Sequence, residues 1–464
     1  MAFARLCYEI RKVSGTVLFR LKKETSAGQR FNPDYWMSNP DEKLNQVNQG
    51  EYPLFFKVKT TEEVLEILNQ FNPLREETIS LEDAFNRVIS QEIISQEDLP
   101  DFPRSSMDGY AVNARDTFGA IETLPVSLDI AGEISIGTAP EISIGPGKAV
   151  RIPTGGMMPK GANAVVMVEY CHLLDNKTIE ISHAVSPLEN VISPGDDFRK
   201  GVTIFKKGTR LRPQDLGLLA GLGISTVTVH KKARVAIIST GDEILPIEQR
   251  PGPGQVRDIN SYTLTAFCRQ AGVIPVNLGL CKDSFNDLRD MVKKGIETAD
   301  TLWISGGSSV GTMDMTVNVL KSFDRMELLV HGISISPGKP TIIVKIGNKA
   351  VFGLPGHAAS AMVIAEIFLN PFLSRLSGDI NAFEDSRFYI EAELSRNIES
   401  ASGRDDYIRV RLEKRDGRLF AEPIFGKSGL ISTLVEAHGL LKIDRNTEGL
   451  YKGQAVKVML FKAL

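Results

Sequence analysis

The sequence lacks the marks of a membrane, nucleic-acid-binding or disulfide-stabilised protein. No apolar run is long enough to span a bilayer. The chain has 54 Lys and Arg against 57 Asp and Glu, so no excess of one charge predicts binding to nucleic acid or to a membrane surface. The four cysteines are scattered without Cys-x-x-Cys spacing, which argues for a reducing compartment and against structural zinc. We therefore expect a cytoplasmic protein with neither nucleic acid nor membrane as a partner.

Residues 1–50 differ from the rest of the chain. They begin with a basic, weakly apolar stretch and end in a polar run. The apolar segment from Val13 to Phe19 is interrupted by Ser14 and Gly15, which argues against a secretory signal. We expect a flexible extension here.

The remaining chain exceeds one hydrophobic core and changes periodicity several times. Thr60 and Glu63 fit a capping box at the start of a helix, and Ser80 with Asp83 resembles a second helix start. Short strands alternating with Gly/Pro turns between about 120 and 190 indicate an inserted β domain. The expected segments are 1–50 (flexible extension), 51–97 with 198–230 (helical or elongated domain I), 98–197 (inserted β domain II), 231–378 (α/β domain III) and 379–464 (C-terminal β domain IV).

The segment from 233 to 375 alternates strands with helices, which predicts a doubly wound α/β domain with a mostly parallel sheet. Strands are expected at Arg234 to Ser239, Val273 to Leu278, Leu302 to Ile304, Thr341 to Val344 and Ala350 to Phe352. Beyond about 386, apolar residues alternate with charged ones from Ile408 to Glu413, and Asp416-Gly417 turns the chain. An antiparallel β domain is therefore expected at the C-terminus.

A glycine-rich loop follows the strand Leu302 to Ile304 and opens a helical pattern. Strand, glycine loop and helix together can bind an anion, because backbone N–H groups converge on it. The loop is neither a Walker loop nor a dinucleotide fingerprint, and it could be only a tight turn. Asp314, just past the loop, would repel an anion unless a cation lay between them. This combination points to metal-bridged phosphate chemistry.

More carboxylates follow the other predicted strands of this domain. Asp242 and Glu243 come after one strand, and Asp283 comes after another. Ligands of open α/β sheets bind outside the carboxyl ends of the strands, where hard oxygen ligands suit Mg²⁺. Asp242 and Asp283 could instead cap helices.

Two other loops carry candidate residues. His357, after Pro355-Gly356, is a lone histidine that we expect to orient another group rather than to ligate metal. Lys339 lies between Pro337 and Pro340, either in a rigid turn or in a position to meet an anion.

Taken together, the motifs resemble those of the molybdenum insertases. These are the molybdopterin molybdenumtransferases, called MoeA in bacteria, and their relatives include the E domain of gephyrin. The resemblance covers about residues 55–464, and it is carried in order by Ser105 to Ala111, Ser239 to Glu243, Ser305 to Gly311 with Asp314, Pro337 to Pro340, and Leu354-Pro355-Gly356. It implies an α/β multidomain fold: a central doubly wound (MogA-like) domain, an inserted small β domain, a helical N-terminal domain and a C-terminal β-barrel-like domain. It also implies a homodimer whose clefts are shared between the α/β domain of one subunit and the inserted domain of the other.

The same resemblance implies a reaction in which molybdate, or tungstate, enters adenylylated molybdopterin with release of AMP and with Mg²⁺ as cofactor. By the resemblance the catalytic residues are Asp108, Asp242, Glu243 and Asp314, of which the last three hold the metal. The substrate-binding residues would be Thr154, Asp197, Asp258, Asn260, Asp283, Ser305, Gly306, Gly307, Ser308, Ser309, Gly311, Pro337, Gly338, Lys339, Pro355, Gly356, His357, Arg404 and Ser432. Asp108 and Thr154 would reach across from the partner, and Arg404 and Ser432 are candidates for the molybdate side.

The chain departs from the family pattern at two positions. His357-Ala358 replaces a common Asn-Pro, which could alter the choice between molybdate and tungstate. Ser336 replaces a common Lys, which removes one cation from the pocket. Two other functions compete: molybdopterin adenylylation, performed by proteins that resemble residues 233–375 alone, and a scaffold without catalysis. The flanking domains argue against the first, and the three carboxylates argue against the second. Other proteins of molybdenum cofactor biosynthesis are possible partners.

Overall fold

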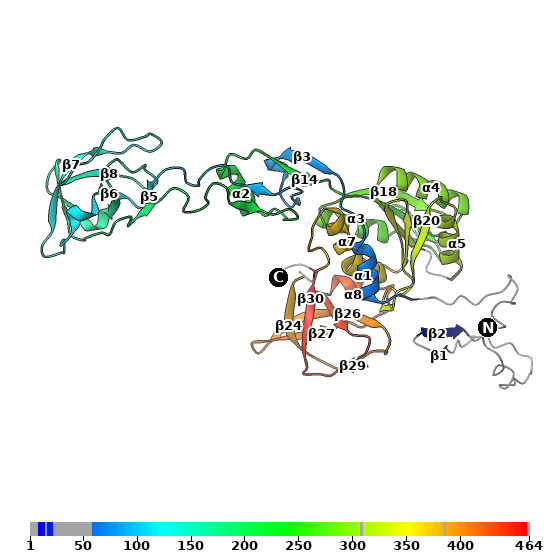
Figure 1. Ribbon diagram of the computed structural model, residues 1–464. Coiled ribbons are helices and arrows are strands. Elements are labelled where there is room, and N and C mark those ends of the chain that lie inside the picture. Colours follow the sequence, from blue (N-terminus) through cyan, green and yellow to red (C-terminus); the bar gives the residue numbers. More distant parts are fainter. Residues whose placement is uncertain (1–7, 14–15, 22–57, 307–309, 385–386, 462–464) are drawn as a thin grey trace, which may run out of the picture. The chain divides into compact units, whose positions relative to one another are not determined.

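The computed structural model describes residues 8–13, 16–21, 58–306, 310–384 and 387–461 (Figure 1). Its contacts divide the chain into two compact units. The first, here called the α/β–barrel unit, comprises Met1–Phe71, Arg234–Phe372 and Asp385–Leu464. The second, here called the inserted unit, comprises Asn72–Ala233 and Leu373–Glu384. The chain therefore leaves the first unit and returns to it, as an insertion requires.

A six-stranded sheet forms the centre of the α/β–barrel unit. Its order is β18 (Ile274–Cys281), β15 (Arg234–Thr240), β19 (Thr301–Gly306), β23 (Lys349–Leu354), β22 (Ile342–Ile346) and β20 (Met326–His331). The first four strands are parallel, and the last two run antiparallel to their neighbours. The predicted doubly wound domain is confirmed, with β20 as an edge strand that the sequence had not revealed.

Helices cover both faces of this sheet (Figure 1). Ala236 and Ile238 belong to a core shared with α4 (Phe285–Thr298) and α5 (Val310–Lys321). On the other face Trp303 packs against Phe267 of α3 (Asn260–Gln270), with ring centroids 6.3 Å apart. Because neither face meets water, the central strands are apolar at almost every position, as the sequence indicated.

A closed five-stranded barrel follows the sheet domain. Its strands are β24 (Tyr389–Leu394), β26 (Asp405–Arg415), β27 (Arg418–Pro423), β28 (Gly439–Ile443) and β30 (Ala455–Leu460), and closure comes from pairing of β26 with both β27 and β28. The expected turn at Asp416-Gly417 has positive φ at both residues, as a tight hairpin needs. A short strand of the α/β domain, β21 (Ile335–Ser336), pairs with the first residues of β26 and so joins the two domains.

The first helix, α1 (Thr61–Asn69), has the expected capping box. The Thr60 backbone N donates to Glu63 at 2.7 Å, and the Glu63 backbone N donates to the Thr60 hydroxyl at 3.2 Å. This helix lies in the α/β–barrel unit, apart from the segments with which the sequence grouped it. The second helix start expected at Ser80 is wrong: Ser80 ends strand β3 (Glu76–Ser80), and only a single 3₁₀ turn follows.

One helical segment is long and apolar enough, by length and composition, to cross a membrane. It runs through α6 (Ala358–Ile364), the π-helical turn η5 (Ala365–Leu369) and α7 (Asn370–Leu376). Its most apolar window is 67% buried inside the protein, as in a core helix. The expectation that no apolar segment reaches this length is corrected accordingly.

The inserted unit is mostly β structure. One part is a six-stranded sheet of β10 (Cys171–Leu173), β11 (Thr178–Ile181), β7 (Val126–Glu133), β8 (Lys148–Ile152), β6 (Gly109–Val112) and β9 (Ala164–Met167). The other part pairs β3 with β14 (Thr226–His230) and β4 (Ile93–Ile94) with β13 (Thr203–Phe205), beside helix α2 (Pro213–Gly221). Domain I therefore contains less helix than expected, because its core is built from these paired strands.

Two further strands, β1 (Tyr8–Val13) and β2 (Thr16–Leu21), form an antiparallel pair within the N-terminal extension. The sequence had not led us to expect them. A two-stranded hairpin has little stability of its own in water. That residues 1–50 are dispensable stays a prediction.

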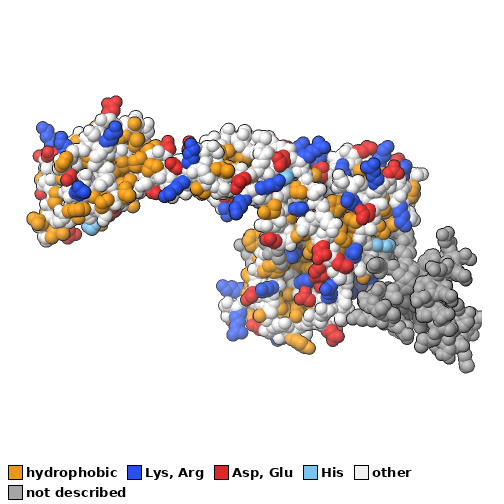
Figure 2. Space-filling view, viewed as in Figure 1, with side chains coloured by type: hydrophobic (Ala, Val, Ile, Leu, Met, Phe, Trp, Pro, Cys, Tyr) orange, Lys and Arg blue, Asp and Glu red, His pale blue; other side chains and the backbone are white. Residues whose placement is uncertain are grey.

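Acidic and basic side chains are interspersed on the face of the molecule drawn in Figure 2. This mixture agrees with the formal net charge of −3.

Candidate active site

Two exposed carboxylates, Asp242 and Glu243, follow the end of β15. Gly241 has φ 151°, and a Cβ added there would lie 2.7 Å from a carboxylate oxygen of Glu243. The glycine thus leaves room for the Glu243 carboxylate to fold back over the loop. Asp242 caps no helix, because the chain continues into the short strand β16 (Ile244–Leu245).

Asp283 joins the ends of β15 and β18. Its carboxylate accepts a hydrogen bond from the Thr240 hydroxyl at 2.9 Å, and its backbone N donates to Asp242 Oδ1 at 3.2 Å. The cap of α4 is instead Ser284, whose hydroxyl accepts from the Asp287 backbone N at 3.5 Å. Asp283 therefore positions the loop that carries Asp242.

Asp258 is buried, and both of its carboxylate oxygens accept hydrogen bonds from neighbouring residues. It accepts from the Ser239 hydroxyl at 3.1 Å, from the Ser261 backbone N at 3.1 Å, and from the Ser261 hydroxyl. These bonds fix the start of α3 against β15. The contacts suit a structural support better than a group that meets substrate directly.

Asn260 connects two loops at the same sheet edge. Its amide nitrogen donates to the Ser305 hydroxyl at 2.6 Å and to the Gly356 carbonyl at 2.8 Å. The glycine loop begins in close contact with β15, since a Cβ on Gly306 would lie 2.1 Å from the Thr240 carbonyl oxygen. The structure thus brings the start of the glycine loop beside the carboxylates, as the sequence predicted.

Part of this site lies outside the described residues, namely Gly307, Ser308 and Ser309. Gly311 and Asp314 belong to α5, but their side chains are not among those described. Among the described residues no three acidic, cysteine or histidine side chains are grouped as a metal site. Mg²⁺ in phosphate sites is held by one or two carboxylates plus substrate oxygens, so Asp242 and Glu243 are a donor set that fits it.

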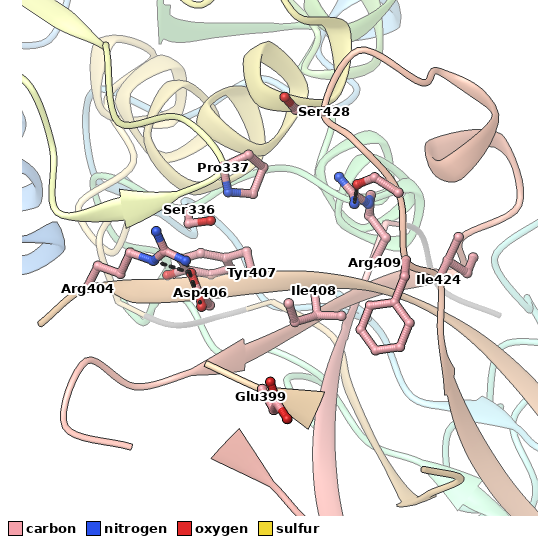
Figure 3. Close-up of a pocket in the computed structure, with 12 residues that line it drawn as sticks. Ser336, Pro337, Glu399, Arg404, Asp406, Tyr407, Ile408, Arg409, Ile424 and Ser428 are labelled. Atoms are coloured by element: carbon pink, nitrogen blue, oxygen red, sulfur yellow. Dashed lines mark hydrogen bonds and ion pairs between the residues drawn. The ribbon is translucent and has the colours of Figure 1, made fainter. Parts of the chain in front are cut away.

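A cavity of about 330 Å³ lies where β21, β26 and the loop after β27 meet (Figure 3). Its lining includes two arginines, two carboxylates, hydroxyl groups and apolar side chains. Its lining residues are Ser336, Pro337, Glu399, Arg404, Asp406, Tyr407, Ile408, Arg409, Ile424, Phe425, Gly426 and Ser428.

The two arginines of the cavity differ in their partners. Arg404 donates through Nε to Asp406 at 2.9 Å, and Asp406 also accepts from the Ser400 hydroxyl at 2.7 Å. Arg409 is 8% exposed and donates through Nη2 to the Gly426 carbonyl at 2.9 Å. Its Nε has no partner, and no carboxylate among the described residues forms an ion pair with it. Burial lowers the pKa of Arg409, so an anion in the cavity would relieve an uncompensated charge.

Lys339 lies close enough to Arg404 for their charges to interact. Partial burial and the charge of Arg404 both lower the pKa of Lys339. The preceding Gly338 has φ 122° and packs against Ile364 of α6. Pro337 lines the cavity, and Lys339 follows it in the same loop without being one of the lining residues.

His357 precedes α6 and is exposed. Its Nδ1 lies 2.8 Å from the hydroxyl of Ser428, a cavity residue. Pro355 and Gly356 precede it in the same loop, and the orienting role of His357 stays a prediction.

Among the cavity residues that the sequence reasoning missed are Arg409 and Ser428, and its candidate Ser432 is not part of the cavity lining. Ser432 starts the short helix α8 (Ser432–Val435) and is not among the lining residues, where Ser428 is found instead. Arg409 was overlooked because Arg409 and Arg411 alternate with apolar residues along β26, a pattern typical of a strand with one face in water. The glycines flanking Ser428, at 426 and 429, were the one signal available in the sequence.

In the inserted unit, Asp108 and Thr154 form a pair. Asp108 Oδ1 accepts from the Thr154 backbone N at 2.6 Å and from its hydroxyl at 2.9 Å. Both residues are exposed, and these hydrogen bonds lower the pKa of Asp108, which keeps it ionised. Asp197 is also exposed, and its backbone N donates to the Leu99 carbonyl at 3.1 Å.

An α/β domain with carboxylates and a glycine loop at its strand ends, next to a cavity with unpaired positive charge, defines a protein that handles anionic substrates. Family models agree in chain order. Residues 59–223 match the MoeA N-terminal region (domain I and II), 236–375 match the "Probable molybdopterin binding domain", and 391–461 match the MoeA C-terminal region (domain IV). The chain belongs to the MoeA family.

Individual relatives support this assignment. A molybdopterin molybdenumtransferase of Bacillus subtilis is 30% identical over 390 residues, which are 83% of this chain and 90% of the relative. One of Haemophilus influenzae is 30% identical over 394 residues, 84% of this chain and 95% of the relative. The crystal structure of a molybdopterin biosynthesis MoeA protein from Pyrococcus horikoshii has 35% identity and a TM-score of 0.73, covering 88% of this chain and all of that one.

Proposed function

We propose that this chain is a molybdopterin molybdenumtransferase of molybdenum cofactor biosynthesis. Relatives that span most of the chain carry this name. The observation that carries the proposal is Arg409, a buried cation without a carboxylate partner at a cavity in the unit that also holds Asp242 and Glu243. Such a unit offers one place for an oxyanion and another for a metal-bridged phosphate.

The phosphate end of the substrate would bind at the sheet edge. The glycine loop offers backbone N–H groups to a phosphate, and Asp242, Glu243 and Asp314 would hold Mg²⁺. When bound, Mg²⁺ would neutralise charge that develops on the phosphates as the link to AMP breaks. Asp283 and Asp258 keep the carboxylate loop and α3 in place through their hydrogen bonds.

The oxyanion end would bind in the cavity. Arg409 supplies positive charge there, Arg404 is paired with Asp406, and the hydroxyls of Ser336 and Ser428 are potential donors. These residues attract molybdate and tungstate alike, so the choice between them stays open. The cavity would gather the second reactant and exclude solvent from its charges.

The proposal includes a homodimer in the cytoplasm. Asp108 and Thr154 are exposed on a unit separate from the carboxylates. A twofold dimer would let the inserted unit of one subunit complete the cleft of the other. Support comes from the family resemblance and from the exposure of this pair.

The test is AMP release by the purified chain. With adenylylated molybdopterin, Mg²⁺ and molybdate, we expect AMP and loaded cofactor, and no AMP when Mg²⁺ is removed by a chelator. Formation of adenylylated molybdopterin from ATP and molybdopterin, without molybdate-dependent AMP release, would show an adenylyltransferase instead. If the folded protein catalyses neither reaction, the remaining interpretation would be a scaffold without catalysis. Supplying molybdate and tungstate in competition would reveal the oxyanion preference.

A further inference from the structure

His357 contacts the cavity only through another residue. It is exposed at the start of α6 and is not among the lining residues, whereas its partner Ser428 is. The bond between His357 Nδ1 and Ser428 Oγ is 2.8 Å long. A substitution at His357 can therefore change the cavity without removing any atom from its wall.

Hydrogen bonds hold the cavity wall formed by residues 424–428 at three places. The Ile424 backbone N donates to the Arg409 carbonyl at 2.8 Å, and the Arg409 guanidinium donates to the Gly426 carbonyl at 2.9 Å. The Ala359 backbone N donates to the Ser428 carbonyl at 3.2 Å, which fixes the backbone of Ser428 independently of the histidine. The imidazole thus acts on the hydroxyl of Ser428, while backbone bonds hold the loop.

The chemistry of a hydroxyl makes this bond decisive for an anion. A serine hydroxyl has one hydrogen to donate and two lone pairs to accept with. If Nδ1 accepts that hydrogen, Ser428 turns lone pairs toward the cavity and repels an oxyanion. If Nδ1 carries a hydrogen and donates it, the Ser428 hydrogen is free for an oxyanion, which can only accept.

We propose that His357 is a positioning residue for the oxyanion: its Nδ1–H donates to Ser428 Oγ and so directs the Ser428 hydroxyl to donate into the cavity. This inference rests on the proposed function of the cavity as the oxyanion site. It makes His357 a determinant of affinity for the oxyanion and leaves the pterin substrate unaffected.

Three substitutions of His357 distinguish the position of the donor nitrogen from the mere presence of a side chain. In His357→Asn the amide nitrogen can occupy the place of Nδ1, whereas in His357→Gln the amide group reaches the place of Nε2 instead. His357→Ala removes both. His438→Ala is the matched control, because His438 Nδ1 accepts from the Leu412 backbone N at 2.9 Å in the barrel but does not line the cavity.

The measurement is the Kd of molybdate for the full chain by titration calorimetry without pterin, together with KM for adenylylated molybdopterin. We expect His357→Ala and His357→Gln to weaken molybdate binding about tenfold, equivalent to ~1.4 kcal/mol. His357→Asn should stay within about twofold to threefold of the unchanged chain, because it keeps the donor. KM for the pterin substrate and the melting temperature should not change, and His438→Ala should leave the Kd of molybdate as it is.

Ser428→Ala tests the same route from the other side. It should weaken molybdate binding as much as His357→Ala does, and the double variant should be no weaker than either single one, since both remove one donor. Simple additivity of the two effects would overturn the proposed route through Ser428.

Other outcomes also contradict the inference. Unchanged molybdate affinity in His357→Ala, or equal recovery by Gln and Asn, would show that Nδ1 directs nothing. A parallel rise of KM for the pterin substrate, with a lower melting temperature, would mean that His357 merely supports the loop. If the unchanged chain bound no molybdate while still releasing AMP, the cavity would not be the oxyanion site, and that failure belongs to the proposed function.

Discussion

The cavity beside Arg409 in the α/β–barrel unit and the Asp108–Thr154 pair of the inserted unit differ in whether their charged groups have partners. In the cavity, Arg409 is buried and lacks a carboxylate partner among the described residues. Asp108 is exposed, and Thr154 already supplies it with two hydrogen bonds. A buried, uncompensated cation costs stability, whereas an exposed and bonded carboxylate costs little. An anion bound in the cavity would therefore compensate the charge of Arg409, whereas Asp108 already has its hydrogen-bond partners.

The comparison bears on how the proposed site is assembled. The α/β–barrel unit contains the carboxylates, the start of the glycine loop and the cavity lined by Arg409. Asp108 and Thr154 belong to the inserted unit, and in the proposed dimer they complete the cleft of the partner subunit. Variants on each side should accordingly fail in different ways.

The largest effect is expected from the carboxylates of the sheet edge. Glu243→Ala or Asp314→Ala should reduce AMP release by at least ~100-fold, since both are proposed to hold Mg²⁺. Folding should be nearly unchanged, and for Glu243 the reason is that its side chain is exposed. Glu248→Ala, at an exposed position farther along the chain after β15, is the control and should stay active. Unimpaired AMP release in either variant would remove that residue from the mechanism.

Arg409→Met tests the cavity side of the comparison. Loss of a charged donor should weaken molybdate binding by roughly 10- to 100-fold, measured by calorimetry. The melting temperature should stay level or rise, because an unpaired buried charge is replaced by an apolar chain of similar length. Arg411→Met, two residues along β26 and paired with Glu413 at the surface, should leave binding unchanged. Equal effects of the two substitutions would contradict a special role for Arg409.

Mixing two inactive chains tests the inserted unit. Asp108→Ala and Asp314→Ala chains, each inactive alone, should partly rescue one another after subunit exchange. About half of randomly formed dimers are mixed, and each of these has one intact cleft, so activity near a quarter of the unchanged protein is expected. Absence of rescue despite demonstrated exchange would mean that each site is built within one chain.

A partly buried carboxyl of the α/β–barrel unit should respond to pH in the opposite sense to the exposed Asp108. Burial raises the pKa of Glu366, in the π-helical turn η5, to about 7, although Arg387 opposes the shift. At pH values between the ordinary glutamate pKa of 4.5 and about 7, the folded chain holds a proton that the unfolded chain has released. This stabilisation is complete below the ordinary pKa of 4.5 and is lost as the pH rises through about 7.

Chemical denaturation between about pH 5 and 8 provides the measurement. The stability difference between the unchanged chain and Glu366→Gln should fall with rising pH. A difference that stays constant with pH would show that Glu366 titrates normally. The Asp108→Asn variant is the comparison. Because the pKa of Asp108 is lowered in the folded chain, its carboxylate stabilises the fold fully at pH values above the ordinary aspartate pKa. This stabilisation is lost as the pH falls through the lowered pKa.

The smallest effect is expected at the N-terminus. Deletion of residues 1–50 should leave AMP release and melting temperature unchanged, since the segment is largely polar toward its end. A large loss of either would show that the segment packs on the body of the protein.

Local pattern determined much of this protein. The continuous apolar runs of the central strands, the capping box at Thr60 and the turn at Asp416-Gly417 each follow from interactions within a few residues, and each was predicted correctly. The carboxylates after β15 were found because parallel strands end at one edge, a rule that needs only the order of elements.

Tertiary structure decided what alternation alone could not. Arg409 and Arg411 occupy equivalent places in the pattern of β26, yet one is buried at a cavity and the other lies at the surface. Arg409 contacts the loop after β27, from which the Gly426 carbonyl accepts its hydrogen bond, whereas Arg411 forms an ion pair with Glu413. Likewise, His357 and Ser428 are separated by 71 residues, and only the packing of α6 against the loop after β27 brings them into hydrogen-bond contact. Contacts of this kind depend on long-range pairing, which short-range patterns in a single sequence do not encode.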